Sequence, residues 1–180
     1  MNKLVFIADF FAHQIAGGAE IYDEILMNEL QSHGVEVCKF NSAEFTKKHF
    51  ALYEKMGFTF LVSNFVQLRE DVKKIMKVYS SKYCILEHDH KYLSNRNPSE
   101  FRGFIAPEQM IINRDFYRSA KQVFCQSIKH AEVLSANLNI DNVTNLSCSL
   151  WSKEQIGLIR SKVCDKNNLA MIINDTNVIK

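Results

Sequence analysis

Short apolar runs alternate with longer amphipathic segments along most of this chain, and this alternation restricts its fold more than any other feature. We predict six strands, at residues 4–8, 35–40, 58–62, 83–86, 122–125 and 143–146. The first run, Leu4–Ala8, is wholly apolar, as expected for a strand that is covered on both faces. Strands that alternate with helices form parallel sheets, so the sequence predicts an α/β protein with a doubly wound parallel sheet.

The segments between the runs have the periodicity and the caps of helices. We expect helices near residues 19–33, 44–56, 64–79, 107–119, 127–138 and 152–163. Asn64 and Gln67 have the spacing of a capping box, and Pro107 suits the first turn of the fourth helix. Ser127 suits the N-cap of the fifth helix. Helices in these positions would cover both faces of a Rossmann-like sheet.

The chain of 180 residues has the length of one domain, or of one domain with the start of another. We assign residues 1–150 to the Rossmann-like domain. Residues 151–180 are expected to form a connecting helix and the first strand, at 169–173, of a second domain.

Composition excludes several classes of function. Twenty-two basic residues against 20 acidic ones give a net charge of +2, which argues against an electrostatic nucleic-acid binder. The chain has no apolar run of about 18 residues, so we expect no transmembrane segment, although peripheral membrane contact stays open. Asp9 ends the first apolar run after five residues, which is too short for a secretory signal peptide, and we expect a cytoplasmic protein.

The five cysteines show no spacing that is typical of a zinc or redox motif. Cys38, Cys84 and Cys125 each lie inside an apolar run. We therefore predict buried, reduced thiols and no disulfide, which agrees with a cytoplasmic protein.

A loop with Gly17-Gly18 follows the first strand and precedes the first helix. Two glycines at a helix start let a phosphate approach backbone N–H groups, and the helix dipole favours its negative charge. The alternative is a plain turn that needs glycine for its dihedral angles. The GxGxxG and P-loop motifs are absent, and the second strand lacks the acidic residue that would bind an NAD ribose, so a dehydrogenase or P-loop enzyme is not expected.

Four ionisable residues, Glu87-His88-Asp89-His90, follow the fourth strand. His-x-His can bind zinc, but no third ligand stands out nearby, so we favour a polar site beside a substrate and expect no metal. The basic residues that follow could contact an anionic substrate, or they could be solvated surface cations. These are Lys91, Arg96, Arg102 and Arg114.

Three segments in this order resemble one known family. The first is a strand, the Gly17-Gly18-Ala19-Glu20 loop and a helix that ends in Ser32-His33-Gly34 before Val35-Glu36-Val37. The second is Ile85-Leu86-Glu87-His88-Asp89, and the third is Ala120–Ser127. The chain is similar to the N-terminal domain of the retaining, two-domain glycosyltransferases of the GT-B fold, of the group 1 or family 4 type.

The resemblance implies transfer of a sugar from a nucleotide-sugar donor to a glycan, lipid or small-molecule acceptor. The donor is a co-substrate, and neither a cofactor nor a metal is required. The family's roles carry over as diphosphate binding by Gly17 and Gly18 and as a catalytic contact of His88 with the donor sugar. We expect the Gly17-Gly18 turn and His88 to meet where strands one and four lie side by side. Further candidate substrate-binding residues are His13, Glu20, Asp89, His90, Arg96 and Arg114.

The family's second domain supplies most donor contacts and carries a motif of two glutamates separated by seven residues. Residues 151–180 account only for its connection and first strand, so these 180 residues alone are expected to be inactive. Two alternatives stay open. One is a non-enzymatic Rossmann-like module that binds a sugar or nucleotide, and the other is a metal-dependent hydrolase that uses His88 and His90.

Overall fold

The structure, a computed structural model, describes residues 2–162 and divides after Leu150 into two units. The first unit carries the sheet and helices α1 to α5. The described part of the second unit carries α6 (Lys153–Ser161), whose N-cap Ser152 forms a capping box with Gln155. The strand expected at 169–173 lies outside the described residues.

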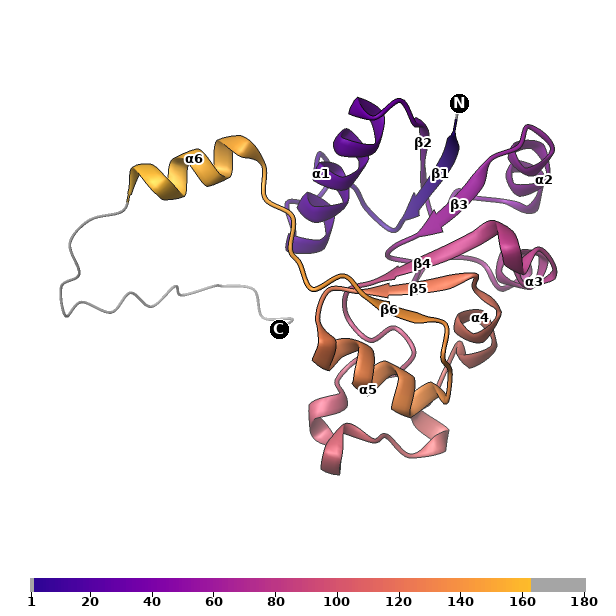
Figure 1. Ribbon diagram of the computed structural model, residues 1–180. Helices are drawn as coiled ribbons and strands as arrows, with labels where there is room; N and C mark the ends of the chain where they lie inside the picture. The colour runs from indigo at the N-terminus through magenta and orange to yellow at the C-terminus, as the bar shows by residue number, and fades with distance from the viewer. Residues whose placement is uncertain (1, 163–180) are drawn as a thin grey trace, which may run out of the picture. The chain divides into compact units, whose positions relative to one another are not determined.

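The first unit is built on a six-stranded, wholly parallel sheet (Figure 1). Its strands are β1 (Lys3–Ala8), β2 (Glu36–Asn41), β3 (Thr59–Val62), β4 (Tyr83–Glu87), β5 (Gln122–Cys125) and β6 (Val143–Asn145). They lie in the order β2-β1-β3-β4-β5-β6. The predicted α/β class and Rossmann-like, doubly wound parallel sheet are confirmed.

Helices cover both faces of this sheet, but unequally (Figure 1). They are α1 (Gly18–Ser32), α2 (Lys47–Lys55), α3 (Glu70–Val78), α4 (Arg114–Ser119) and α5 (Ile128–Leu138). Side chains alternate along β1, so Val5 and Ile7 pack into the core shared with α2 to α5, while Phe6 and Ala8 pack into the core beneath α1. Both faces of the strand are therefore buried, which explains why residues 4–8 are all apolar.

The chain reverses its direction across the sheet after β2. It passes from β1 outward to β2 and then back to β3 on the other side of β1. Because both crossovers are right-handed by rule, this reversal places α1 and α2 on opposite faces. In doubly wound sheets ligands bind beside such a reversal, which here lies at the carboxyl ends of β1 and β3. The expectation that strands one and four are neighbours is wrong, because β3 lies between them.

The Asn64/Gln67 capping box is not formed. Helix α3 begins only at Glu70, after an N-cap without a side-chain hydrogen bond. The backbone N–H groups of Val66 and Gln67 instead donate to the buried carboxylate of Asp9, at 2.9 and 3.0 Å. This charged acceptor at the end of β1 holds the turn at Val66 and Gln67 in place.

The single helix predicted over 107–119 is replaced by two short elements. A 3-10 turn, Glu108–Met110, is followed by Ile111, which forms an antiparallel bridge with Leu93. Asn113 then adopts the left-handed conformation, with φ of 56°, before α4 begins. A bridge residue and a left-handed residue cannot continue a helix, so it is interrupted here. By contrast, the Ser127 cap of α5 is confirmed, since its hydroxyl accepts from the His130 backbone N–H at 3.1 Å.

No helix within residues 2–162 combines the length and the apolar character needed to cross a membrane. Among these residues the four cysteines are free thiols, as predicted, but their burial differs from the prediction. Cys125 is buried, whereas Cys38 and Cys84 are only half-buried and Cys148 is exposed. Cys164 lies outside the described residues.

Thiol titration is expected to separate these cysteines. Burial raises the pKa of Cys125 to about 12, so its thiolate is scarce at neutral pH and it should react slowly with a disulfide reagent in the native protein. Exposed Cys148 should react first. All five thiols should react in denaturant without a reducing agent, and a count below five would contradict the reduced state.

Candidate functional site

The first two turns of α1 contact the carboxyl ends of two different strands. The amide of Asn64, just after β3, donates to the Glu20 carboxylate at 3.4 Å. The Nε2 atom of His88, just after β4, lies 3.0 Å from the Asp23 carboxylate. Helix α1 therefore links the ends of β3 and β4, beside the point where the strand order reverses.

The two glycines at the start of α1 do not need glycine for their backbone angles. Gly17 is the N-cap, with φ of −98° and ψ of 164°, and neither Gly17 nor Gly18 has a positive φ. A Cβ atom added to Gly18 would meet nothing within 4 Å. One added to Gly17 would meet only the flexible end of the Glu20 side chain, at 2.1 Å. Gly18 therefore leaves open space beside the backbone N–H groups, whereas the space at Gly17 is filled by the Glu20 carboxylate.

His88 and Asp23 form a buried pair. Asp23 is fully buried, the His88 side chain is 6% exposed, and the Tyr22 ring meets His88 edge-on at 5.4 Å. An ionised carboxylate only accepts hydrogen bonds, so this contact places a proton on Nε2 of His88 and leaves Nδ1 as an acceptor. The second Asp23 oxygen, Oδ2, is also buried and has no hydrogen-bond partner among residues 2–162.

Glu87, the last residue of β4, holds the next part of the loop in a buried polar network. Its carboxylate accepts from the Lys91 ammonium at 3.0 Å and from the Tyr117 hydroxyl. Glu87 and Lys91 are both almost fully buried. Burial alone would raise the pKa of Glu87, but the Lys91 charge and the hydrogen bonds from Tyr117 and Lys91 lower it to about 2. Lys91 is therefore a structural cation here.

Asp89 and Arg96 lie at the outer edge of this network. The Asp89 carboxylate accepts from Lys91 and, at 3.2 Å, from the Arg96 guanidinium. Both Asp89 and Arg96 are about half exposed, with 45% and 48% of their side chains accessible. They remain open to solvent and to a ligand.

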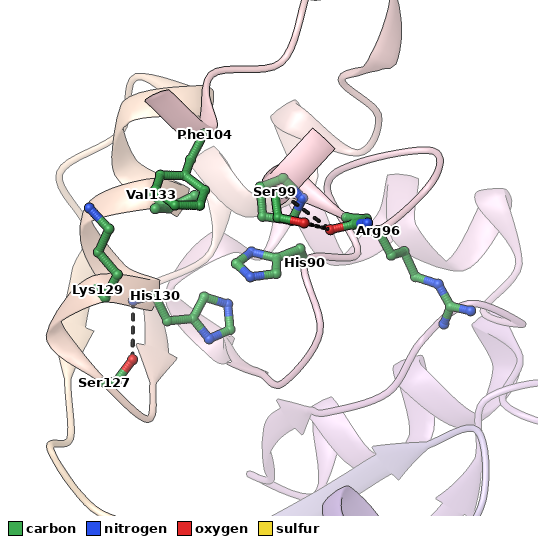
Figure 2. A pocket seen from close by; sticks show the side chains of 10 residues that line it. His90, Arg96, Ser99, Phe104, Ser127, Lys129, His130 and Val133 are labelled. Carbon is green, nitrogen blue, oxygen red and sulfur yellow. Dashed lines mark hydrogen bonds between the residues drawn. The ribbon is translucent and has the colours of Figure 1, made fainter. Parts of the chain in front are cut away.

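His90 points to a different neighbour from His88. Its Nδ1 atom lies 3.0 Å from the Tyr92 hydroxyl, and its ring centroid lies 4.2 Å from that of His130 on α5 (Figure 2). The two rings line a cleft of about 430 Å³ between the loops that follow β4 and β5. Burial lowers the pKa of both imidazoles, that of His130 to about 4.

The other sequence-predicted residues are placed elsewhere. His13 is exposed and stacks on Phe11, with ring centroids 6.3 Å apart. Arg114 pairs with Glu108 and donates to the backbone carbonyl of Asn137 at 3.3 Å. Helix α1 thus connects Gly17, Gly18 and Glu20 to His88 through Asp23. Within residues 2–162, neither His13 nor Arg114 contacts this group.

Sequence reasoning missed Asp23, Asn64 and His130. The signal for Asp23 was present, because this acid lies four residues before Met27, on the face of α1 that is buried against the sheet. Asn64 was assigned to a helix cap. His130 had no local signal, since only the packing of α5 brings it to His90.

Among residues 2–162, no three His, Cys, Asp or Glu side chains gather as a metal site would require. His88 and His90 bind Asp23 and Tyr92 respectively, so they do not converge on one point.

The fold and the site define a doubly wound α/β protein with a polar site at the carboxyl edge of its parallel sheet. Comparisons of the chain with protein-family models, with curated proteins and with solved structures gave no match. The chemistry of the site therefore has to be taken from its own residues.

Proposed function

We propose that this chain is the acceptor-side, N-terminal domain of a nucleotide-sugar-dependent glycosyltransferase of the GT-B fold, which transfers the sugar with retention. The observation that carries the proposal is the contact between Asp23 and His88. It ties the helix that begins with Gly17-Gly18 to the end of β4, so two motifs far apart in sequence share one edge of the sheet. Asp23 lies five positions after Gly18, which is about 7.5 Å along the helix. One sugar diphosphate can span this distance.

In this proposal the glycine turn binds the donor diphosphate. Free N–H groups and the helix dipole at the start of α1 favour a negative charge there. Negative charge gathers on the leaving diphosphate as the glycosidic bond breaks, so these donors stabilise the transition state more than the ground state. The Glu20 carboxylate lies over Gly17 and would have to swing away to admit the diphosphate.

His88 then orients the donor sugar. With its Nε2 proton bound to Asp23, the neutral ring can accept a hydrogen bond from a sugar hydroxyl at Nδ1. Asp23 is a positioning residue, because its contact fixes the tautomer and the plane of the imidazole. Neither step requires a protonated histidine.

Residues 1–180 by themselves are expected to bind nucleoside diphosphate sugars weakly and to transfer no sugar. The donor half of the proposed enzyme, which would close over the donor and exclude water, is not among them. Titration with UDP- and GDP-sugars is monitored by NMR. The amide signals of Gly17 and Gly18 and the imidazole signals of His88 should shift. Transfer is measured in parallel as release of nucleoside diphosphate.

The Gly18→Ala variant should fold normally, since its new methyl group meets open space, and it should lose this weak binding. Gly157→Ala is the matched control, because a Cβ atom there also meets nothing within 4 Å. Appreciable turnover by residues 1–180 would show that the active site is misplaced. Sugar-nucleotide binding without transfer by the complete gene product would favour the non-enzymatic binding module.

A further inference from the structure

The cleft beside His90 and His130 carries chemistry that the proposed donor site does not use (Figure 2). It lies between the loops after β4 and β5 and has a volume of about 430 Å³. None of the ten residues that line it is acidic. The lining includes His90, Phe104, Ser127, Lys129, His130 and Val133.

Lys129 is one of two cations among the described residues that line this cleft. Its ammonium lies over the Phe104 ring, 5.1 Å from the centroid, and 3.7 Å from the Glu132 carboxylate. The pair with Glu132 is exposed on both sides, and such pairs contribute little. The Arg96 guanidinium, by contrast, binds Asp89 and points away from the two imidazoles (Figure 2).

The histidine pair leaves a hydrogen-bonding atom without a partner. The Nε2 atom of His130 is buried and has no hydrogen bond within residues 2–162. Leaving a buried polar atom without a partner costs free energy, which a ligand oxygen that reaches Nε2 would recover. Ser127 adds a hydroxyl that accepts from the His130 backbone N–H and still has its own hydrogen to donate.

Burial disfavours the charged form of both rings and lowers the pKa of each. The pKa of His130 falls to about 4, and the Lys91 charge acts in the same direction, as do His90 and His88 when they are protonated. Glu87 opposes this shift for His130, and Glu87 and Asp89 oppose it for His90. A dianion bound beside them would favour the charged form of the rings and raise their pKa.

We propose that this cleft binds a small molecule that carries a phosphate monoester. Lys129, His130 and Ser127 would donate to the phosphate oxygens, and Phe104 and Val133 would contact the apolar part of the ligand. A phosphate monoester offers three strong acceptor oxygens, so it can take up more of the donors that line this cleft than a carboxylate can. Naming this ligand as the sugar acceptor rests on the proposed function, whereas the binding itself does not.

The test uses phenyl phosphate as the probe. Inorganic phosphate and phenol, which each carry one part of the probe, are measured for comparison. We expect saturable binding of phenyl phosphate by calorimetry, weaker binding of phosphate and none of phenol. NMR titration of the imidazoles should show a higher pKa for His130 when phenyl phosphate is bound. Absence of saturable binding, or an unchanged His130 pKa with the probe bound, would overturn the proposal.

Two variants and one matched control locate the site. Lys129→Ala and His130→Gln should each weaken phenyl phosphate binding about tenfold or more, the loss typical of one charge-assisted hydrogen bond. Lys121→Ala is the matched control, because Lys121 is exposed and precedes β5 at the opposite edge of the sheet. An equal loss in Lys121→Ala, or no loss in both cleft variants, would contradict the assignment.

Further measurements distinguish a lipid headgroup from a free phosphate ester as the ligand, and the phosphate cleft from the proposed donor site. Binding to phosphatidic acid vesicles but not to phenyl phosphate, if lost in Lys129→Ala, would assign the same phosphate site to a lipid headgroup. Gly18→Ala should leave phenyl phosphate binding unchanged. If phenyl phosphate binds and no nucleotide sugar does, the phosphate cleft stands and the proposed glycosyltransferase function fails.

Discussion

The His88→Ala variant of the complete enzyme is expected to lower kcat for sugar transfer by about 10²-fold or more, as loss of an oriented catalytic contact typically does. His88 is held by Asp23 at 3.0 Å in a buried pair, so its ring position is defined before any ligand binds. Transfer would be measured at saturating donor, so that the loss is seen in kcat.

Asp23→Asn should act through His88. An amide can donate to the ring as well as accept from it, so the tautomer is no longer fixed and kcat should fall with little change in KM. Imidazole ¹⁵N NMR signals should show that His88 no longer holds a single tautomer in the same variant. A merely structural role would not change the tautomer together with kcat.

The control for both variants is His33→Ala, because this exposed histidine lies at the C-terminal end of α1. It should leave kcat unchanged. If a stably folded His88→Ala enzyme keeps near-normal turnover, the role assigned to His88 is wrong, and His90 and His13 are the next residues to test.

Breaking the buried Glu87–Lys91 pair is expected to have the largest effect on stability. Glu87→Gln or Lys91→Met leaves a buried charge without its partner, which typically costs about 3–5 kcal/mol in the free energy of unfolding. Urea unfolding measures the loss. The double variant should regain part of it, because neither charge then remains, and Lys47→Met, which breaks an exposed pair with Asp71, should cost about 1 kcal/mol or less.

The same pair predicts how stability depends on pH. The folded-state pKa of Glu87 is lowered to about 2 from an ordinary 4.5, so its contribution is fully present above pH 4.5. It is lost as the pH falls from 4.5 toward 2, where the carboxylate takes up a proton. The free energy of unfolding of Glu87→Gln should therefore depend less on pH between 2 and 4.5 than that of the unsubstituted protein. Equal acid sensitivity of the two proteins would contradict the lowered pKa.

Local sequence patterns were sufficient for most of the elements. All six strands lie where the sequence predicted them. In β1 the reason is that a strand buried on both faces has no polar alternate positions. The helix after Gly17-Gly18 and the Ser127 cap of α5 also followed from contacts within one or two turns. The fourth predicted helix failed because Ile111 pairs with Leu93, a contact that helical periodicity does not report.

The order of the strands and the partners of the site residues were decided by tertiary structure. Wholly apolar strands do not specify their neighbours, so only the reversal after β2 placed β3 between β1 and β4. Sequence alone marked Gly17, Gly18 and His88 as candidates, through their positions after strands. It could not pair His88 with Asp23 or His90 with His130, because those contacts join segments brought together by packing across the sheet edge, where spacing along the chain carries no information.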